Sequence, residues 1–190
     1  QNAGDVTVNT GEGNITGGVF GVAARGNRDV SVTTQSGTVS GKDIGIIASN
    51  KYQGTVKITT GTGDILGRSY GIIATSRGGD IEINTGTGTI GTRTDDPNVP
   101  GTRTGIGAFA GYSNFENDTA NTTINIGAGT VNGTTAVGAV GVNSNITVDG
   151  DVFVNAGKSV YGSGIATSAH GNIRGIPTEE RTAADLGMNT

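Results

Sequence analysis

The chain has 190 residues, a length that suits a single domain. It contains 36 glycines, no cysteine and no tryptophan, and only 4% of its residues are aromatic, which excludes a disulfide framework and a core of large side chains. The net charge of −4 argues against a nucleic-acid partner, which would need a basic face, and no segment approaches the roughly 20 apolar residues of a membrane-spanning helix.

An internal repeat starts near the beginning of the chain. Each unit opens with two aliphatic residues separated by one residue, at steps of 24, 26 and 25 residues: Val6/Val8, Val30/Val32, Val56/Ile58 and Ile81/Ile83. Seven residues later comes a further aliphatic residue: Ile15, Val39, Ile65 and Ile90. A glycine and an aliphatic residue then precede an alanine two positions on: Gly21-Val22, Gly45-Ile46, Gly71-Ile72 and Gly105-Ile106. Self-similarity at about 25 residues is typical of a solenoid.

Two further units are less regular. The fifth consists of Ile124, Ile126, Val131 and Gly138-Ala139. For the sixth we expect Val152/Val154, then Val160 and finally Gly164-Ile165-Ala166. With these two units the repeat spans residues 1–175.

Each unit contains three short strands separated by three turns. In the first strand the aliphatic residues alternate with outward positions, as a half-buried strand requires. A glycine-rich turn follows, because glycine allows the backbone angles of a tight corner: Gly11-Glu12-Gly13, Gly61-Thr62-Gly63 and Gly86-Thr87-Gly88. The pattern predicts an all-β fold, a right-handed single-stranded parallel β-helix of about six coils. A left-handed helix would need six-residue sub-periods, which are absent.

Equivalent residues of successive coils should stack into columns. The column Thr10, Thr34, Thr60 and Thr85 continues as Ile126, so we expect it to face inward or to lie at a buried corner. An acidic column at the strand start, interrupted by Thr55 and Asn121, is expected to be solvated: Asp5, Asp29, Asp80 and Asp151.

Two insertions and a tail interrupt the repeat. Proline and glycine mark a loop at Thr92–Thr104, and a second insertion spans Gly111–Asn121. Loops on a rigid scaffold often carry function. The tail, residues 176–190, is expected to be a cap or the junction to a missing continuation.

One stretch carries a resemblance to a known family. Gly79 to Gly91 has the sequence Gly-Asp-Ile-Glu-Ile-Asn-Thr-Gly-Thr-Gly-Thr-Ile-Gly, and a Gly-Ile-x-Ala segment follows. This pattern, over roughly residues 4 to 175, resembles the passenger regions of Gram-negative autotransporters (type V secretion). The resemblance implies secretion through a C-terminal translocator barrel of the full-length protein. It also implies display on, or release from, the cell surface, with a role in adhesion, aggregation or host-cell signalling.

Catalytic and metal sites find little support in the sequence. Asp64 lies in a segment similar to the calcium-binding nonapeptide repeat, but the other coils have Asn14, Thr38 and Thr89 at its position. A glycosidase needs paired carboxylates, and the outward strand positions contain no such pair: Thr7, Ser31, Lys57, Glu82, Thr123 and Phe153. His170 has no fixed partner. We therefore expect no enzyme activity, no metal and no cofactor.

The turns after the third strand contain basic and aromatic residues that stacking would place on one edge of the rod. The candidate ligand-binding residues there are Arg25, Arg28, Lys51, Tyr52, Arg77, Tyr112 and Phe115, with His170 and Arg174 further along. Tyrosine and arginine are common anchors of binding surfaces, although basic turns can also serve only solubility.

The expected function is therefore a non-enzymatic adhesin or host-interacting segment, secreted or on the surface of a Gram-negative bacterium, and a contributor to virulence. Its expected partners are a host receptor or glycan, or further copies of itself. A structural spacer, a carbohydrate-active enzyme and an ice-binding solenoid are the alternatives.

Overall fold

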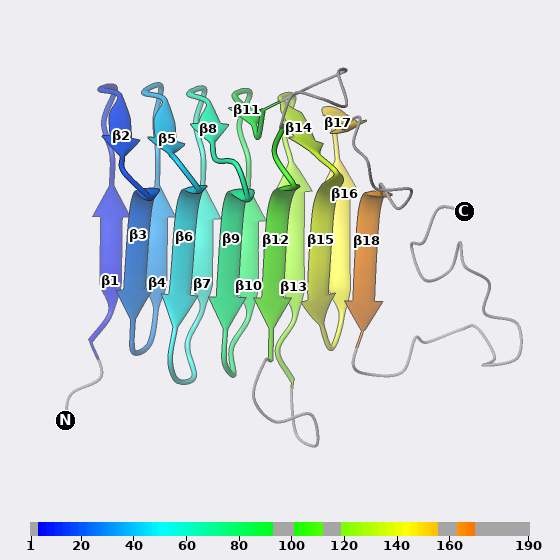
Figure 1. Cartoon of the computed structure of the whole chain (residues 1–190). Helices are drawn as coiled ribbons and strands as arrows, with labels where there is room; N and C mark the ends of the chain where they lie inside the picture. Colours follow the sequence, from blue (N-terminus) through cyan, green and yellow to red (C-terminus); the bar gives the residue numbers. More distant parts are fainter. Residues whose placement is uncertain (1–3, 93–100, 112–118, 156–162, 170–190) are drawn as a thin grey trace, which may run out of the picture.

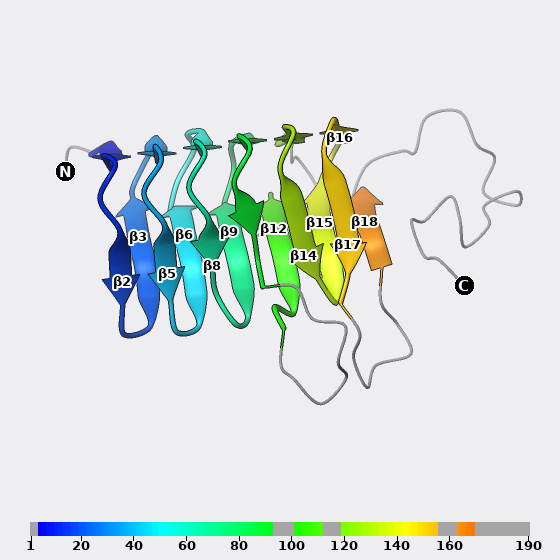
Figure 2. The same ribbon diagram turned by 90° about the horizontal axis from the view of Figure 1, so that it is seen from above.

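The computed structural model describes residues 4–92, 101–111, 119–155 and 163–169. In these ranges the chain forms three parallel sheets of six strands each and no helix. It passes through the first, second and third sheet in turn, six times over (Figure 1). Seen from the N-terminal end, the chain turns clockwise as it recedes (Figures 1 and 2). This confirms the predicted right-handed parallel β-helix of six coils.

The strands of each sheet follow the rod axis in coil order. The first sheet contains β1 (Val6–Asn9), β4 (Val30–Thr33), β7 (Val56–Thr59), β10 (Ile81–Asn84), β13 (Thr122–Ile126) and β16 (Ser144–Val148). The second contains β2 (Ile15–Gly17), β5 (Val39–Gly41), β8 (Ile65–Leu66), β11 (Thr89–Ile90), β14 (Thr130–Gly133) and β17 (Asp151–Val154). The third contains β3 (Phe20–Gly26), β6 (Ile44–Asn50), β9 (Tyr70–Ser76), β12 (Thr104–Ala110), β15 (Thr135–Gly141) and β18 (Ser163–Ala169).

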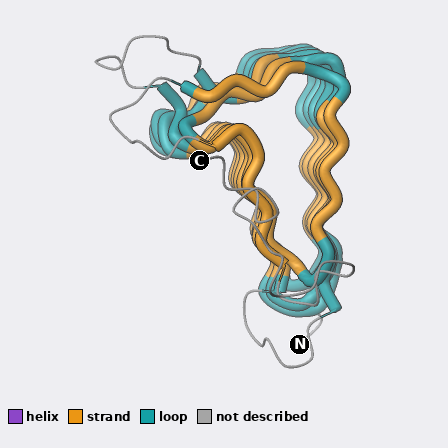
Figure 3. Tube along the Cα trace, turned by 90° about the vertical axis from the view of Figure 1, so that its right-hand side faces the viewer, coloured by secondary structure: helices purple, strands orange, loops and turns teal. Residues whose placement is uncertain are grey.

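The three sheets form the sides of the cross-section (Figure 3), and their inward side chains form one hydrophobic core. Val32, Ile58, Ile83 and Ile124 occupy one column of the first sheet and are fully buried. Burial of one such side chain contributes about 1.5–3 kcal/mol. The alternation predicted from the sequence therefore gives the inward face of the first sheet correctly.

The threonine column also faces inward. Thr10, Thr34 and Thr60 are buried, as expected. The Thr60 hydroxyl accepts a hydrogen bond from the Gly86 N–H at 3.2 Å, and that of Thr85 accepts one from Gly127 at 3.1 Å. Thr60 and Thr85 thus each link their coil to the next.

Close stacking explains the glycines of the first turn. A Cβ at Gly63 would lie 2.2 Å from the carbonyl oxygen of Gly37, and one at Gly88 would lie 2.1 Å from that of Gly63. Gly13, the equivalent residue of the first coil, would meet nothing within 4 Å. These glycines are required because each coil lies directly on its predecessor, rather than by an unusual φ.

The acidic column at the start of the first sheet contains backbone acceptors. The Asp29 carboxylate accepts the N–H of Thr55 at 2.8 Å, and Asp80 accepts that of Asn121 at 2.7 Å. Asn143, rather than Asp151, continues the column, since its amide donates to Asn121 at 2.8 Å. Each carboxylate therefore binds the coil above it, beyond the solvated role predicted.

Both insertions leave the coil at a glycine with φ of +77°, Gly91 and Gly111. The base of the first is fastened by Thr102, which is fully buried. Its hydroxyl donates to the Gly67 carbonyl at 2.6 Å and accepts the N–H of Thr92 at 2.7 Å. The side-chain amide of Asn155 donates to the carbonyls of Thr92 and Thr102. Residues 93–100, 112–118 and the tail 176–190 lie outside the described residues.

The prediction of the sixth unit was wrong, because it assigned Val152 and Val154 to the first strand of the coil instead of the second. Val152 pairs with Val131 in the second sheet, and Val154 pairs with Gly133. The first strand of the sixth coil is β16, in which Ser144 pairs with Thr122 of the fifth coil. This strand was missed because a polar residue replaces the first aliphatic one and only Val142 and Asn143 separate it from β15. The predicted Val160 lies outside the described residues.

The glycine stacking predicts a position-dependent effect of alanine. Gly63→Ala should destabilise the protein by about 1–3 kcal/mol, because the new methyl group overlaps a backbone carbonyl that cannot move alone. Gly13→Ala, the matched control, should change stability by less than about 0.5 kcal/mol. Urea unfolding followed by circular dichroism measures both. Equal effects at the two sites would contradict the stacking explanation.

The carboxylate column predicts a second difference. Asp80→Ala should cost about 1 kcal/mol, since the N–H of Asn121 loses its acceptor. Asp80→Asn should restore most of this loss, because Asn14 already accepts the N–H of Thr38 in the same way at 3.0 Å. The comparison uses the same unfolding assay. If Asn were as damaging as Ala, negative charge rather than the hydrogen bond would be the stabilising factor.

Candidate binding face on the third sheet

The middle of the outer side of the third sheet is apolar, unlike the outer side of the first. Its middle row contains Ala23, Ile47 and Ile73, which are paired in register and face away from the buried Val22, Ile46 and Ile72. Ile47 and Ile73 are partly buried at the surface. We call Ile47, Ile73, Tyr70 and Phe109 the apolar floor.

Two aromatic rings lie on this floor because a neighbouring position has no side chain. Gly107 pairs with Ile73 of the preceding coil. A Cβ there would lie 3.1 Å from the Tyr70 ring and 3.2 Å from the Phe109 ring. The two rings therefore flank Gly107 on the outer surface.

A groove of about 950 Å³ opens at the C-terminal ends of these strands. Ile73 and Phe109 contribute apolar surface to it, and Arg25, Lys51 and Arg77 contribute positive charge. The three basic residues are exposed and come from successive coils. Backbone hydrogen bonds hold the turns in place, with the Lys51 N–H donating to the Gly26 carbonyl at 3.1 Å. The groove thus combines an apolar surface with a cationic border.

The structure places five of the seven predicted ligand-binding residues along this edge. Arg25 lies near the end of β3, and Arg28, Lys51, Tyr52 and Arg77 lie in the turns that follow the third sheet. Arg25, Lys51 and Arg77 line the groove together, whereas Arg28 and Tyr52 lie in the same turns outside its lining. Tyr112, Phe115, His170 and Arg174 lie outside the described residues.

Two of the cations lie over aromatic rings. The Arg25 guanidinium is 5.8 Å from the centre of the Phe20 ring, and the Lys51 ammonium is 5.6 Å from that of Tyr52. Such contacts orient long side chains without neutralising them. Asp5, a carboxylate of the acidic column, also belongs to the groove lining. The groove lining therefore contains three cations and one carboxylate, Asp5.

The apolar floor was missed from the sequence. Its signal is the doubled aliphatic in Gly45-Ile46-Ile47-Ala48 and in Gly71-Ile72-Ile73-Ala74. Neighbouring residues of a strand face opposite sides, so only one of the two isoleucines can enter the core. Tyr70 and Phe109 could not be placed on this face without the register.

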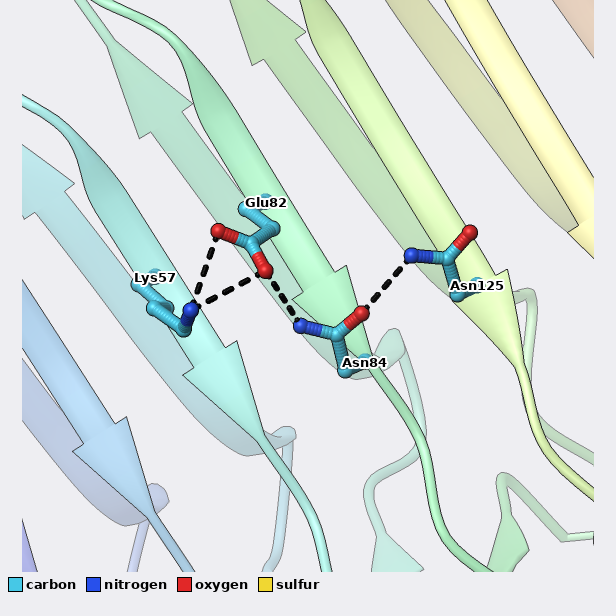
Figure 4. A network of polar contacts seen from close by, with 4 residues as sticks. All are labelled: Lys57, Glu82, Asn84 and Asn125. Atoms are coloured by element: carbon cyan, nitrogen blue, oxygen red, sulfur yellow. Dashed lines mark hydrogen bonds and ion pairs between the residues drawn. The ribbon is translucent and has the colours of Figure 1, made fainter.

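The outer side of the first sheet has a different character. Lys57 donates to both carboxylate oxygens of Glu82 at 3.0 and 3.1 Å, and Asn84 donates to Glu82 at 2.6 Å (Figure 4). Asn125 then donates to Asn84 at 2.8 Å. Hydrogen bonds from Asn84 and Lys57 hold the pKa of the Glu82 carboxyl below its ordinary value. These polar groups bind one another across three coils, which indicates a structural role.

The remaining chemical candidates also have structural partners. The Asp64 carboxylate, weighed as a calcium ligand, accepts the N–H of Thr89 at 2.8 Å. Phe153 was predicted to be an outward residue of the first sheet. It instead pairs with Asn132 in the second sheet. Across the described residues, no three His, Cys, Asp or Glu side chains gather in a group that could hold a metal ion. None of these residues forms a helix with the length and apolar character that a membrane crossing requires.

Comparisons with known proteins return no relative. No protein-family model matches the chain, and neither the curated proteins nor the solved structures contain a significant match. The candidate face is therefore defined by its own geometry.

The lowered pKa of Glu82 predicts a pH-dependent contribution to stability. A carboxyl with a depressed pKa in the folded state stabilises the protein above its unfolded pKa, and this contribution is lost as the pH falls through the folded pKa. Wild type should thus exceed Glu82→Gln in stability at about pH 7, by at most about 0.5 kcal/mol because both partners are exposed, and the difference should be smaller at about pH 3. Urea unfolding at both pH values, with Glu12→Gln as the control, measures it. A difference that grows on acidification would contradict this assignment.

Proposed function

We propose that this chain is a non-enzymatic segment of an autotransporter-type surface or secreted protein of a Gram-negative bacterium, and that it mediates adhesion or another contact with host cells. The full-length protein would include a C-terminal translocator barrel. The observation that carries this proposal is the groove in which Arg25, Lys51 and Arg77 border the apolar surface of Ile73 and Phe109. The partner would be a host-cell receptor or glycan.

The rigidity of the rod supports a binding role for this groove. Each groove residue belongs to a coil held in register with its neighbours, so little ordering entropy is lost when a ligand binds. Arginine and aromatic side chains at the centre of a surface are frequent energetic anchors. The first-sheet surface, by contrast, uses Lys57 and Glu82 for an ion pair of its own.

Binding to cells tests the proposal. The labelled chain should bind cultured mammalian cells saturably. The combined variant Arg25→Ser, Lys51→Ser and Arg77→Ser should lose at least about tenfold in affinity for these cells. The control is Thr7→Ala, Thr123→Ala and Asn145→Ala on the outer side of the first sheet, which should bind as wild type does. Circular dichroism of all three proteins establishes that each is folded.

The outcomes separate the two leading functions. Loss of binding in the groove variant alone supports adhesion through this edge. Folded wild-type protein that binds no cell type would overturn the proposal and favour a structural spacer, in which the rod only holds another domain away from the cell.

A further inference from the structure

A second set of basic residues lies at the opposite ends of the third-sheet strands. Lys42 and Arg68 each stand two residues before their strands β6 and β9, and Ile44 pairs with Tyr70, so they occupy equivalent positions in consecutive coils. Arg103 lies on the next coil one residue before β12, at the register position that follows Arg68, and its N–H donates to the Arg68 carbonyl at 3.0 Å. All three side chains are exposed. We call Lys42, Arg68 and Arg103 the corner column.

Within the part of the chain that the structure describes, no ion pair joins the corner column to a carboxylate. Consecutive coils are roughly 4.8 Å apart, and like charges at that spacing repel. Among the described residues the ion pair present is Lys57–Glu82, on the first sheet. The adjacent carboxylate, Asp43, accepts a hydrogen bond from the Ser69 hydroxyl. The protein as a whole is acidic, with a net charge of −4. An anionic ligand would relieve this local repulsion.

The two basic edges enclose the apolar floor. Third-sheet strands such as β3, β6 and β9 have seven residues and are roughly 20 Å long, and the corner column and the groove cations lie at their opposite ends. Between them lie Ile47, Ile73, Tyr70 and Phe109. The whole face therefore presents positive charge on two sides and aromatic and aliphatic surface in the middle.

This arrangement disfavours a second copy of the chain as the occupant. If two copies met face to face through the third sheet, basic edges would meet basic edges in either orientation. A flat bilayer is also a poor match, because the large exposed apolar side chains of the described residues lie outside the third-sheet strands: Val19, Tyr52, Val148 and Val154. The side chains of the apolar floor are partly buried and do not protrude. The floor therefore favours a ligand that packs flat along the surface of the sheet.

We infer that the outer face of the third sheet binds a linear acidic polysaccharide. Its carboxylate or sulfate groups contact the corner column and the groove cations, where arginine forms charge-assisted hydrogen bonds. The C–H faces of its sugar rings pack on Tyr70 and Phe109. This inference rests on the proposed function and adds to it the ligand class and a second contact region.

Binding to defined polysaccharides tests the inference. Immobilised heparin and hyaluronan serve as acidic probes, and dextran serves as the neutral one. The variant Lys42→Ser, Arg68→Ser and Arg103→Ser lowers the net charge by three on this face. A control with Thr7→Glu, Thr33→Glu and Asn145→Glu lowers it equally on the first sheet. Wild type and control should bind heparin or hyaluronan with similar affinity, and the corner variant should bind about tenfold more weakly with a shallower salt dependence.

Parallel measurements distinguish this inference from the proposed function. Saturable binding to cells without binding to either acidic polysaccharide would overturn the ligand class and leave adhesion in place. Equal binding by the corner variant and the control would overturn the role of the corner column. Equal binding to poly-glutamate or to anionic phospholipid vesicles would overturn the preference for sugars. Binding to heparin without binding to cells would overturn the proposed adhesion and leave the ligand class in place.

Discussion

The interaction on which the whole structure depends is the in-register stacking of each residue on its equivalent in the next coil. Parallel backbone hydrogen bonds fix the spacing, and the side chains must accept it. The inward columns satisfy this requirement with Val and Ile, which pack well against copies of themselves on a pleated surface. The corners satisfy it with glycine, because the carbonyl of the coil below occupies the place of a Cβ.

The same constraint decides which polar residues are structural. A carboxylate at the start of the first sheet is well placed to accept an N–H one coil further on, and Asp29 and Asp80 both do so. Lys57 and Glu82 meet because register places them opposite each other. Where register instead stacks like charges, as it does with Lys42 and Arg68, no internal partner is found among the described residues. A polar column whose members bind one another offers few groups to a ligand. A column of like charges leaves its charged groups available to one.

Much of the fold could be predicted from the sequence because burial on one side of a strand leaves a period of two. The first four coils follow this pattern closely. The sixth did not, because Ser144 replaces the aliphatic residue that marks the strand and its turn is short. The candidate face was predicted only in part: basic turns such as Lys51 and Arg77 are visible in the sequence, whereas Tyr70 and Phe109 become neighbours only through Gly107. Arg103 joins the corner column from within an insertion, where no periodicity could locate it.

The closed base of the first insertion has a consequence for engineering. Thr92 and Thr102 bind each other, and Asn155 of a later coil donates to both of their carbonyls. The two ends of the inserted segment are therefore held together by the rod rather than by the segment itself. Extending a loop whose ends are already closed carries only a small entropic cost. This position is suited to serve as a cassette site, at which a foreign peptide can replace residues 93–100 while the coils above and below keep their stacking.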